Sequence, residues 1–311
     1  LLIHLKVKHM ISRKNILNKF KWLNDSNRHF IISANYDGLI CAAFLSHYLN
    51  WKLVGYYNME KIWISDTGVQ NKKDLIWVDL DILSRTGKTL GGHIIKLEDS
   101  IPSGFDSSCN PNIFLNLSNK DFTKKYPLST LAFLMWLFNI QIPSKNFAKF
   151  LILHSDAIWL KYQRYTKNFN DWLALLDDYK WEKLFNNIDS LNYDKKVDQI
   201  FYPQLINAGA ISGFSKLYSK YLNIKSRESK FNPDWDEDVI LNLLHIFAEH
   251  LSWNPLKLPK INKRINGQKK SILIEEVRAI GLSDFIKKNK IFSYAITSPK
   301  IIKYTVFDTI K

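Results

Sequence analysis

The sequence predicts an α/β protein with a doubly wound, mostly parallel sheet in its N-terminal half, followed by a helical region and a small basic C-terminal α+β part. Up to about residue 160, short apolar runs that end in Asp, Asn or Gly alternate with segments of helical apolar spacing. From Pro127 onward most segments have 3.6-residue spacing, which is typical of helices. Residues 257–311 contain thirteen Lys or Arg and four acids.

The chain carries a large excess of positive charge. Its 311 residues include 44 Lys and Arg and 29 Asp and Glu, which gives a formal net charge of +15. This charge predicts attraction to polyanions, with nucleic acid or a nucleotide as the first candidate partner and an anionic membrane surface as the second. The abundance of Lys, Asn and Ile also fits an AT-rich genome, so a compositional origin of the charge stays open.

Cysteine use and hydropathy predict the compartment. Cys41 and Cys109 cannot form a disulfide framework and neither belongs to a CxxC motif, so we expect a reducing, cytoplasmic location. The longest apolar run, 131–142, is interrupted by Asn139 and Gln141 and falls short of the ~18 residues that span a bilayer. We therefore expect no membrane insertion. The opening apolar run is too short for a signal peptide, and Met10 is an alternative start.

Four regions are expected along the chain. They are a basic N-terminal extension (1–27) with an amphipathic helix over 11–23, an α/β domain (28–165), a helical region (166–253) and a basic C-terminal region (254–311). In the α/β domain we expect strands at 30–33, 51–57, 62–65, 74–79 and 93–97, with a tight turn at 35–38 and a helix over 39–48.

Helices follow in the second half of the chain. We expect them over 128–138, 146–162, 169–176 and 204–222, and another that starts at Asp234 or Asp236 and continues to residue 251. Residues 254–270 contain two prolines, one glycine and many cations, and they are interpreted as a basic linker. The segments 291–296 and 301–307 predict a β-hairpin.

Acidic residues follow two of the expected strands. Asp37 comes after strand 30–33, whereas Asp79 and Asp81, the second being the weaker candidate, come after strand 75–78. Ligands of an open parallel sheet bind beyond the carboxyl ends of its strands. His93 follows Gly91 and Gly92, and Asp156 interrupts an apolar helix, where an unpartnered carboxylate is costly.

These residues suggest a cation site. Carboxylate oxygens with one imidazole suit Mn²⁺ or Mg²⁺ better than a structural zinc ion. The sequence therefore predicts Asp37, Asp79, His93 and Asp156 as metal-binding and catalytic residues. The structural alternatives are turn chemistry for Asp37 before Gly38, a loop role for His93, and a pairing of Asp156 with His154 or Lys161. His154 itself is interpreted as structural.

The pattern resembles the DHH phosphoesterase family of nucleases, phosphodiesterases and manganese pyrophosphatases. The family's first motif, Asp-x-Asp followed by Gly or Ala, corresponds to Asn35-Tyr36-Asp37-Gly38. Its second motif, a strand that ends in Val-Asp, matches Val78-Asp79. The Asp-His-His triplet corresponds to Gly91-Gly92-His93, and the acid late in an apolar helix corresponds to Asp156. The resemblance covers about 130 residues and implies a metal-dependent phosphoesterase.

The departures from the family concern one metal of its pair. Ile31 stands where the first motif usually has a His, Asn35 replaces its earlier Asp, and two triplet residues are glycines. The resemblance thus implies that one metal site survives and the second is degenerate. Two-metal phosphoryl transfer needs both ions, so a catalytically inactive subunit that binds nucleic acid or a protein partner in a larger complex is the alternative.

Four further residues are candidates for substrate binding. Ser33 and Asn35 lie beside the first motif and are expected to orient substrate or water. Asn110 belongs to the polar segment 107–112, whose alternative interpretation is an ordinary Asx-Pro turn. Lys124 precedes the helix at 128–138, whose N-terminus is a candidate phosphate site. Cations with interleaved aromatics near both ends of the chain suit single-stranded nucleic acid, and they suit an ordinary solvated surface equally well.

Overall fold

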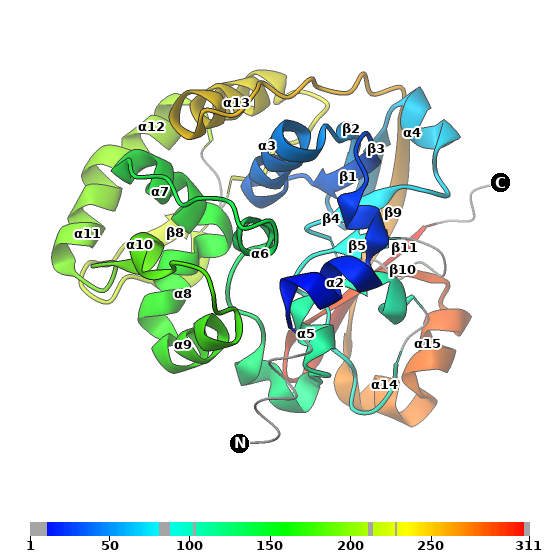
Figure 1. Cartoon of the computed structure of the whole chain (residues 1–311). Helices are drawn as coiled ribbons and strands as arrows, with labels where there is room; N and C mark the ends of the chain where they lie inside the picture. Colours follow the sequence, from blue (N-terminus) through cyan, green and yellow to red (C-terminus); the bar gives the residue numbers. More distant parts are fainter. Residues whose placement is uncertain (1–10, 81–87, 102–103, 211–213, 228, 308–311) are drawn as a thin grey trace. The chain divides into compact units, whose positions relative to one another are not determined.

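The computed structural model describes residues 11–80, 88–101, 104–210, 214–227 and 229–307 (Figure 1). Its contacts divide the chain into two units. Unit 1 comprises 1–33, 49–126 and 257–311, and unit 2 comprises 34–48 and 127–256. Each unit is therefore built from segments that are far apart in the sequence.

Unit 1 is organised around a nine-stranded sheet with the order β10-β11-β9-β3-β2-β1-β4-β5-β6. The strands are β1 (His29–Ser33), β2 (Lys52–Tyr57), β3 (Lys61–Ile64), β4 (Ile76–Val78), β5 (Lys88–Leu90), β6 (Ser108–Cys109), β9 (Lys263–Leu273), β10 (Ile291–Ser298) and β11 (Ile301–Phe307). β1 pairs in parallel with β2 and β4, and β4, β5 and β6 continue in parallel. The pairings from β2 through β3, β9 and β11 to β10 are antiparallel. The α/β class is confirmed, and the sheet is mixed.

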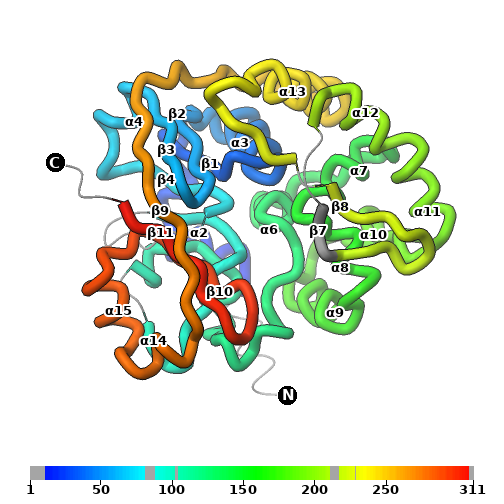
Figure 2. Tube along the Cα trace, turned by 180° about the vertical axis from the view of Figure 1, so that it is seen from behind, coloured from blue at the N-terminus to red at the C-terminus, as the bar shows by residue number. Residues whose placement is uncertain are grey.

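The C-terminal strands belong to this same sheet. β10 and β11 form the predicted hairpin, and β9 lies between β11 and β3, as the orange and red segments of Figure 2 show. The prediction of a linker over 254–270 is wrong from Lys263 onward, where β9 begins. Most of β9 is exposed or half-buried, so its sequence lacks the apolar alternation from which a strand is recognised.

The core of unit 1 packs against the central strands. Ile31, Val54 and Tyr57 are buried with Trp77 and Leu80, and Phe292 from β10 packs against this cluster. The Tyr57 and Phe292 rings meet edge to face with their centroids 5.6 Å apart. Because burial of each large apolar side chain is worth roughly 1.5–3 kcal/mol, these contacts hold the strands that precede Asp79 in place.

One predicted strand of unit 1 is wrong. Residues 93–97 form no strand, whereas the strand next to β4 is β5, which ends at Leu90. Ile94 and Ile95 are nevertheless fully buried. The apolar run at 93–97 thus indicates that this segment is buried, but the segment is a loop. The helices of unit 1 are α2 (Arg13–Lys19), η1 (Lys21–Asn24), α4 (Asp66–Gln70), η2 (Phe105–Ser107), α5 (Pro111–Phe114), η3 (Asn119–Lys124), α14 (Ile274–Ile280) and α15 (Leu282–Lys288).

Unit 2 is mainly helical, as predicted for the middle of the chain. Its helices are α3 (Tyr36–Leu49, whose last residue belongs to unit 1), α6 (Thr130–Leu137), α7 (Asn146–His154), η4 (Ser155–Ala157), α8 (Ile158–Arg164), α9 (Thr166–Leu175), α10 (Glu182–Phe185), α11 (Leu191–Lys196), η5 (Val197–Phe201), α12 (Tyr202–Asn207) and α13 (Glu237–Leu251). The helix predicted over 204–222 is wrong beyond Asn207, because β7 (Phe214–Tyr218) pairs with β8 (Lys225–Arg227). The helix predicted over 146–162 is broken into α7 and α8 by η4. Within the described ranges, no helix is long and apolar enough to cross a membrane.

Candidate functional site

Asp79 is a buried carboxylate at the carboxyl end of β4 in unit 1. Residues Ile32 of β1 and Val78 of β4 are paired, so the chain brings the next residue of each strand, Ser33 and Asp79, to the same edge. The Ser33 hydroxyl donates a 2.6 Å hydrogen bond to Asp79 Oδ2. Only 3% of the Asp79 side chain is exposed, and its φ is +58°, a left-handed conformation that Asp tolerates better than most residues. A buried carboxylate in this position needs donors or a cation.

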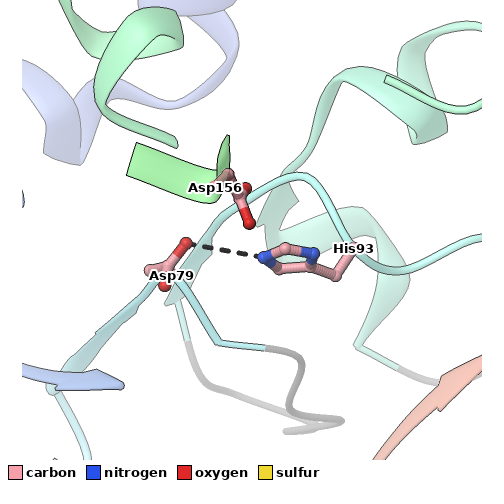
Figure 3. A group of neighbouring side chains, drawn as sticks. All are labelled: Asp79, His93 and Asp156. Atoms are coloured by element: carbon pink, nitrogen blue, oxygen red, sulfur yellow. Dashed lines mark ion pairs between the residues drawn. The ribbon is translucent and has the colours of Figure 1, made fainter. Parts of the chain in front are cut away.

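His93 lies beside Asp79. Its Nε2 is 3.5 Å from Asp79 Oδ1, and about a third of the His93 side chain is exposed (Figure 3). Two of the four predicted ligands are thus neighbours in unit 1. An imidazole and a carboxylate oxygen at this distance offer a cation two ligands of the kind that Mn²⁺ accepts.

The loop that carries His93 is held by Asn112, a residue that was not among the predicted site residues. Asn112 is fully buried, and its Nδ2 donates to the carbonyl oxygens of Gly92 at 2.7 Å and Ile94 at 3.3 Å, on either side of His93. Its Oδ1 accepts a 2.7 Å hydrogen bond from the amide of Tyr126. In the sequence Asn112 is one asparagine of the polar segment 107–112. Its presence there does not reveal which backbone groups its side chain binds.

The two glycines before His93 differ in the space around them. A Cβ added to Gly92 would meet Cδ1 of the Tyr126 ring at 2.7 Å, whereas one added to Gly91 would meet no atom closer than 3.6 Å. Neither glycine has a positive φ. Gly92 therefore lets the backbone approach the buried Tyr126 ring closely. A larger side chain at this position would displace Tyr126.

In unit 2, Asp37 and Asp156 are joined directly. Asp37 lies in the first turn of α3, and its Oδ1 accepts a short hydrogen bond from the backbone amide of Asp156. Lys161 Nζ lies 3.7 Å from Asp156 Oδ1. The salt bridge between Asp156 and Lys161, one of the structural alternatives, is thus present. The two predicted ligands Asp37 and Asp156 lie next to each other in unit 2.

Asp156 does not lie within a continuous α-helix, contrary to the expectation, but in the short segment η4 between α7 and α8. The residues Asp156 and Ala157 have φ values of +53° and +51°, and this pair of left-handed residues ends α7 and starts α8. Two consecutive left-handed residues other than glycine are costly and are often found where function requires a particular backbone direction. Here the break turns the amide of Asp156 toward the Asp37 carboxylate.

A cavity of about 120 Å³ adjoins these residues within unit 2. Both acids line it, together with Lys161, Arg227 and the buried hydroxyl-bearing Ser226. The volume is small compared with the roughly 300–1,000 Å³ of ordinary ligand pockets. If Asp37 and Asp156 hold a metal ion, the side chains of Lys161, Arg227 and Ser226 suit a compact anionic group in this space.

His154 also lines this cavity. Burial lowers its pKa to about 4, although a hydrogen bond with the backbone of Arg227 acts in the opposite direction. Its ring is therefore neutral at pH 7. Its Nδ1 is buried and has no hydrogen-bond partner among the described residues, so His154 is a candidate acceptor that the sequence, in which it was interpreted as structural, did not reveal.

The remaining predicted residues have structural roles. Asn35 Oδ1 accepts from Gly38 N at 2.9 Å and so caps the first turn of α3. Asn110 is buried and binds the amide of Asn112 and the carbonyl of Ile94, as in an Asx-Pro turn. Lys124 forms an ion pair with Asp121 on η3.

The N-terminus of α6, predicted as a phosphate site, is capped by Ser129, whose side chain accepts from Ala132 N at 3.1 Å. Asp81, the weaker candidate after β4, lies outside the described residues.

In unit 1, the dashed line of Figure 3 joins Asp79 to His93, the acid and histidine that this unit offers to a cation. Comparisons with protein-family models, curated proteins and solved structures find no match to the chain. Inferences about function therefore depend on the side chains described above.

Proposed function

We propose that the chain is a divergent DHH-like, metal-dependent phosphoesterase that acts on or binds nucleic acid or nucleotide phosphodiesters. The main support is Asp79, a buried carboxylate that faces His93 at 3.5 Å at the carboxyl edge of the parallel strands. This is the edge at which α/β sheets, and the doubly wound sheet that we expect here, bind ligands. The resemblance in motif order supplies the reaction class.

Asp79 and His93 of unit 1 are proposed to hold one Mn²⁺ or Mg²⁺ ion. Carboxylate oxygens with an imidazole suit these two metal ions. The other two predicted ligands, Asp37 and Asp156, belong to unit 2, where the Asp37 carboxylate accepts a hydrogen bond from the amide of Asp156.

In this proposal each group has a defined task. A bound divalent ion supplies Lewis acidity toward a phosphoryl oxygen and lowers the pKa of a bound water. Ser33 fixes the orientation of the Asp79 carboxylate through its hydrogen bond. In unit 2, Lys161 and Arg227 line the cavity beside Asp156 and suit the negative charge of a phosphoryl group.

Two observations favour the alternative of an inactive DHH-like subunit that binds nucleic acid or a protein partner. The amide oxygen of Asn35 is used to cap α3, and Gly92 is pressed against Tyr126, so these two positions offer no ligands to a second ion. Such a subunit would bind polyanions even in the presence of a chelator. The salt dependence of this binding would be set by the number of its phosphate contacts.

Metal-dependent thermal unfolding separates these possibilities. We expect Mn²⁺ at about 100 times its Kd to stabilise the wild type by about 2.7 kcal/mol, and expect Asp79→Ala and His93→Ala to abolish this shift. Asp66→Ala, which removes an exposed carboxylate of α4, is the matched control and should keep it. No shift in the wild type would refute the metal site.

A turnover assay then tests catalysis. The wild type should cleave a short single-stranded oligonucleotide in Mn²⁺ and Asp79→Ala should not. A metal-dependent shift without cleavage of oligonucleotides or dinucleotides would support the inactive subunit. Equal cleavage by wild type and Asp79→Ala would contradict the assigned catalytic role.

A further inference from the structure

Unit 2 carries a basic groove that the metal site does not use. It consists of two cavities, of about 740 Å³ and about 190 Å³, which share Lys149, Lys183 and Asn186 in their walls. Because three residues belong to both linings, the two cavities adjoin each other on unit 2, and we call them together the basic groove. Its walls come from the start of α7, from α10 and α11, and from the end of α13.

The charge of this groove is strongly one-sided. Lys145, Lys149, Lys183 and Lys196 line it, against the single acid Glu182. Among the described residues, none of the four lysines forms an ion pair with an acid, in contrast to Lys167 and Lys220 elsewhere in unit 2, which do. Four uncompensated ammonium groups on a concave surface concentrate a polyanion there.

The other groups in the walls suit nucleotides. Asn146, Asn186, Asn187 and Asn192 present side-chain amides, which both donate to and accept from base edges. His250 lines the larger cavity, and its ring lies tilted against that of Phe147 with the centroids 4.2 Å apart. Flat rings accept base stacking. The larger cavity falls within the ordinary size range of a small-ligand pocket, roughly 300–1,000 Å³.

The hydroxyl of Tyr193 provides an independent indication of a ligand. Tyr193 lines the smaller cavity, and its hydroxyl is buried without a hydrogen-bond partner among the described residues. Burial of an unsatisfied hydroxyl is unfavourable. A bound polar group in this cavity would satisfy it.

We propose that this groove binds single-stranded nucleic acid and guides it along α7. The helix α7 carries Lys149 near its start and leads directly to Asp156 after its end. Its nine residues span on the order of 13 Å. This inference deepens the proposed function and rests on its nucleic-acid part, but it does not depend on the metal ion.

Salt-dependent binding of the full chain in EDTA tests the groove separately from the metal site. The probes are fluorescent 12-nucleotide single strands of DNA and RNA. In Lys149→Gln/Lys183→Gln, the slope of log affinity against log salt should become shallower by roughly 1.4, since each single-strand phosphate contact contributes about 0.7. The loss of affinity at 0.1 M salt should be roughly tenfold or more.

The control removes the same charge elsewhere in unit 2. Lys167→Gln/Lys195→Gln alters two exposed lysines that do not line the groove and should bind like the wild type. Equal losses in both double variants, or no loss in either, would overturn the assignment of the groove. Equal affinity for a duplex, or displacement of the strand by polyglutamate at equal charge concentration, would overturn the choice of a single strand as its ligand.

Discussion

The Ser33 hydroxyl donates a 2.6 Å hydrogen bond to the buried Asp79 carboxylate across the paired ends of β1 and β4. Ser33→Ala should lower the free energy of unfolding by about 2 kcal/mol, because hydrogen bonds to charged groups contribute roughly 1.5–3 kcal/mol. Urea denaturation measures this loss. Ser26→Ala, at an exposed serine of the same unit, should stay within about 0.5 kcal/mol of the wild type; a similar effect in both variants would contradict the prediction.

Asn112 determines the position of the His93 loop. Asn112→Ala leaves the carbonyls of Gly92 and Ile94 and the amide of Tyr126 without their partner, so we expect a loss of about 3 kcal/mol or more. The imidazole signal of His93 in NMR spectra should shift or broaden. The exposed Asn24 donates one hydrogen bond, to Leu17 O, and Asn24→Ala should leave the His93 signal unchanged. An unchanged signal in Asn112→Ala would show that other contacts hold the loop.

Gly92 and Gly91 provide a matched pair. Gly92→Ala places a methyl group 2.7 Å from the Tyr126 ring, and overpacking of this kind typically costs 1–3 kcal/mol. Gly91→Ala finds its nearest neighbour at 3.6 Å and should change the free energy of unfolding little. Thermal melting of the two variants compares them, and equal melting temperatures would refute the steric explanation.

The left-handed break after α7 predicts opposite effects of glycine at two alanines. Ala157 has a φ of +51°, where a side chain costs roughly 1–2 kcal/mol, so Ala157→Gly should relieve this cost. Ala148 is buried in regular helix, where glycine costs about 1 kcal/mol. In chemical denaturation Ala157→Gly should therefore be more stable than Ala148→Gly by about 2 kcal/mol; the reverse order would contradict the left-handed conformation.

His29 predicts a pH dependence that is separate from the candidate site. Burial lowers its pKa, and Lys52, its partner on the neighbouring strand, lowers the pKa further. As pH falls below about 6.5, the unfolded chain takes up this proton more readily than the folded one, so stability decreases. In Lys52→Gln the His29 pKa, followed by NMR, should rise toward its ordinary value. Lys72→Gln, at an exposed lysine, should leave it unchanged, and an unmoved His29 pKa in Lys52→Gln would exclude Lys52 as a cause.

The strands nearest the candidate site could be predicted because they carry strong local signals. The segments before Ser33 and Asp79 are apolar, β-branched or aromatic and bounded by turn residues, and both form strands. The segment 93–97 has the same composition but forms a loop, since apolar character reports burial and not pairing. β9 could not be recognised because its exposed Lys residues obey no two-residue alternation.

The candidate site could be predicted in part for a related reason. Carboxylates at strand ends can be located by counting along the chain, and Asp79 and His93 are neighbours as expected. The roles of Asn35 and Asn110 depend on which amide lies within reach of each side chain, and the sequence does not contain that distance. Asn35 Oδ1, for example, accepts a hydrogen bond from the amide of Gly38 and caps the first turn of α3.

The position of β9 has a consequence for biosynthesis. β9 is hydrogen-bonded to β3, although about 200 residues separate them in the chain. Contacts of such long sequence separation form slowly, and during translation the edge of β3 has no partner until residues 263–273 have left the ribosome. Until then this edge presents open backbone donors and acceptors to other chains. A nascent polypeptide that stalls before β9 should therefore depend on chaperones, whereas one released after β11 completes its own sheet.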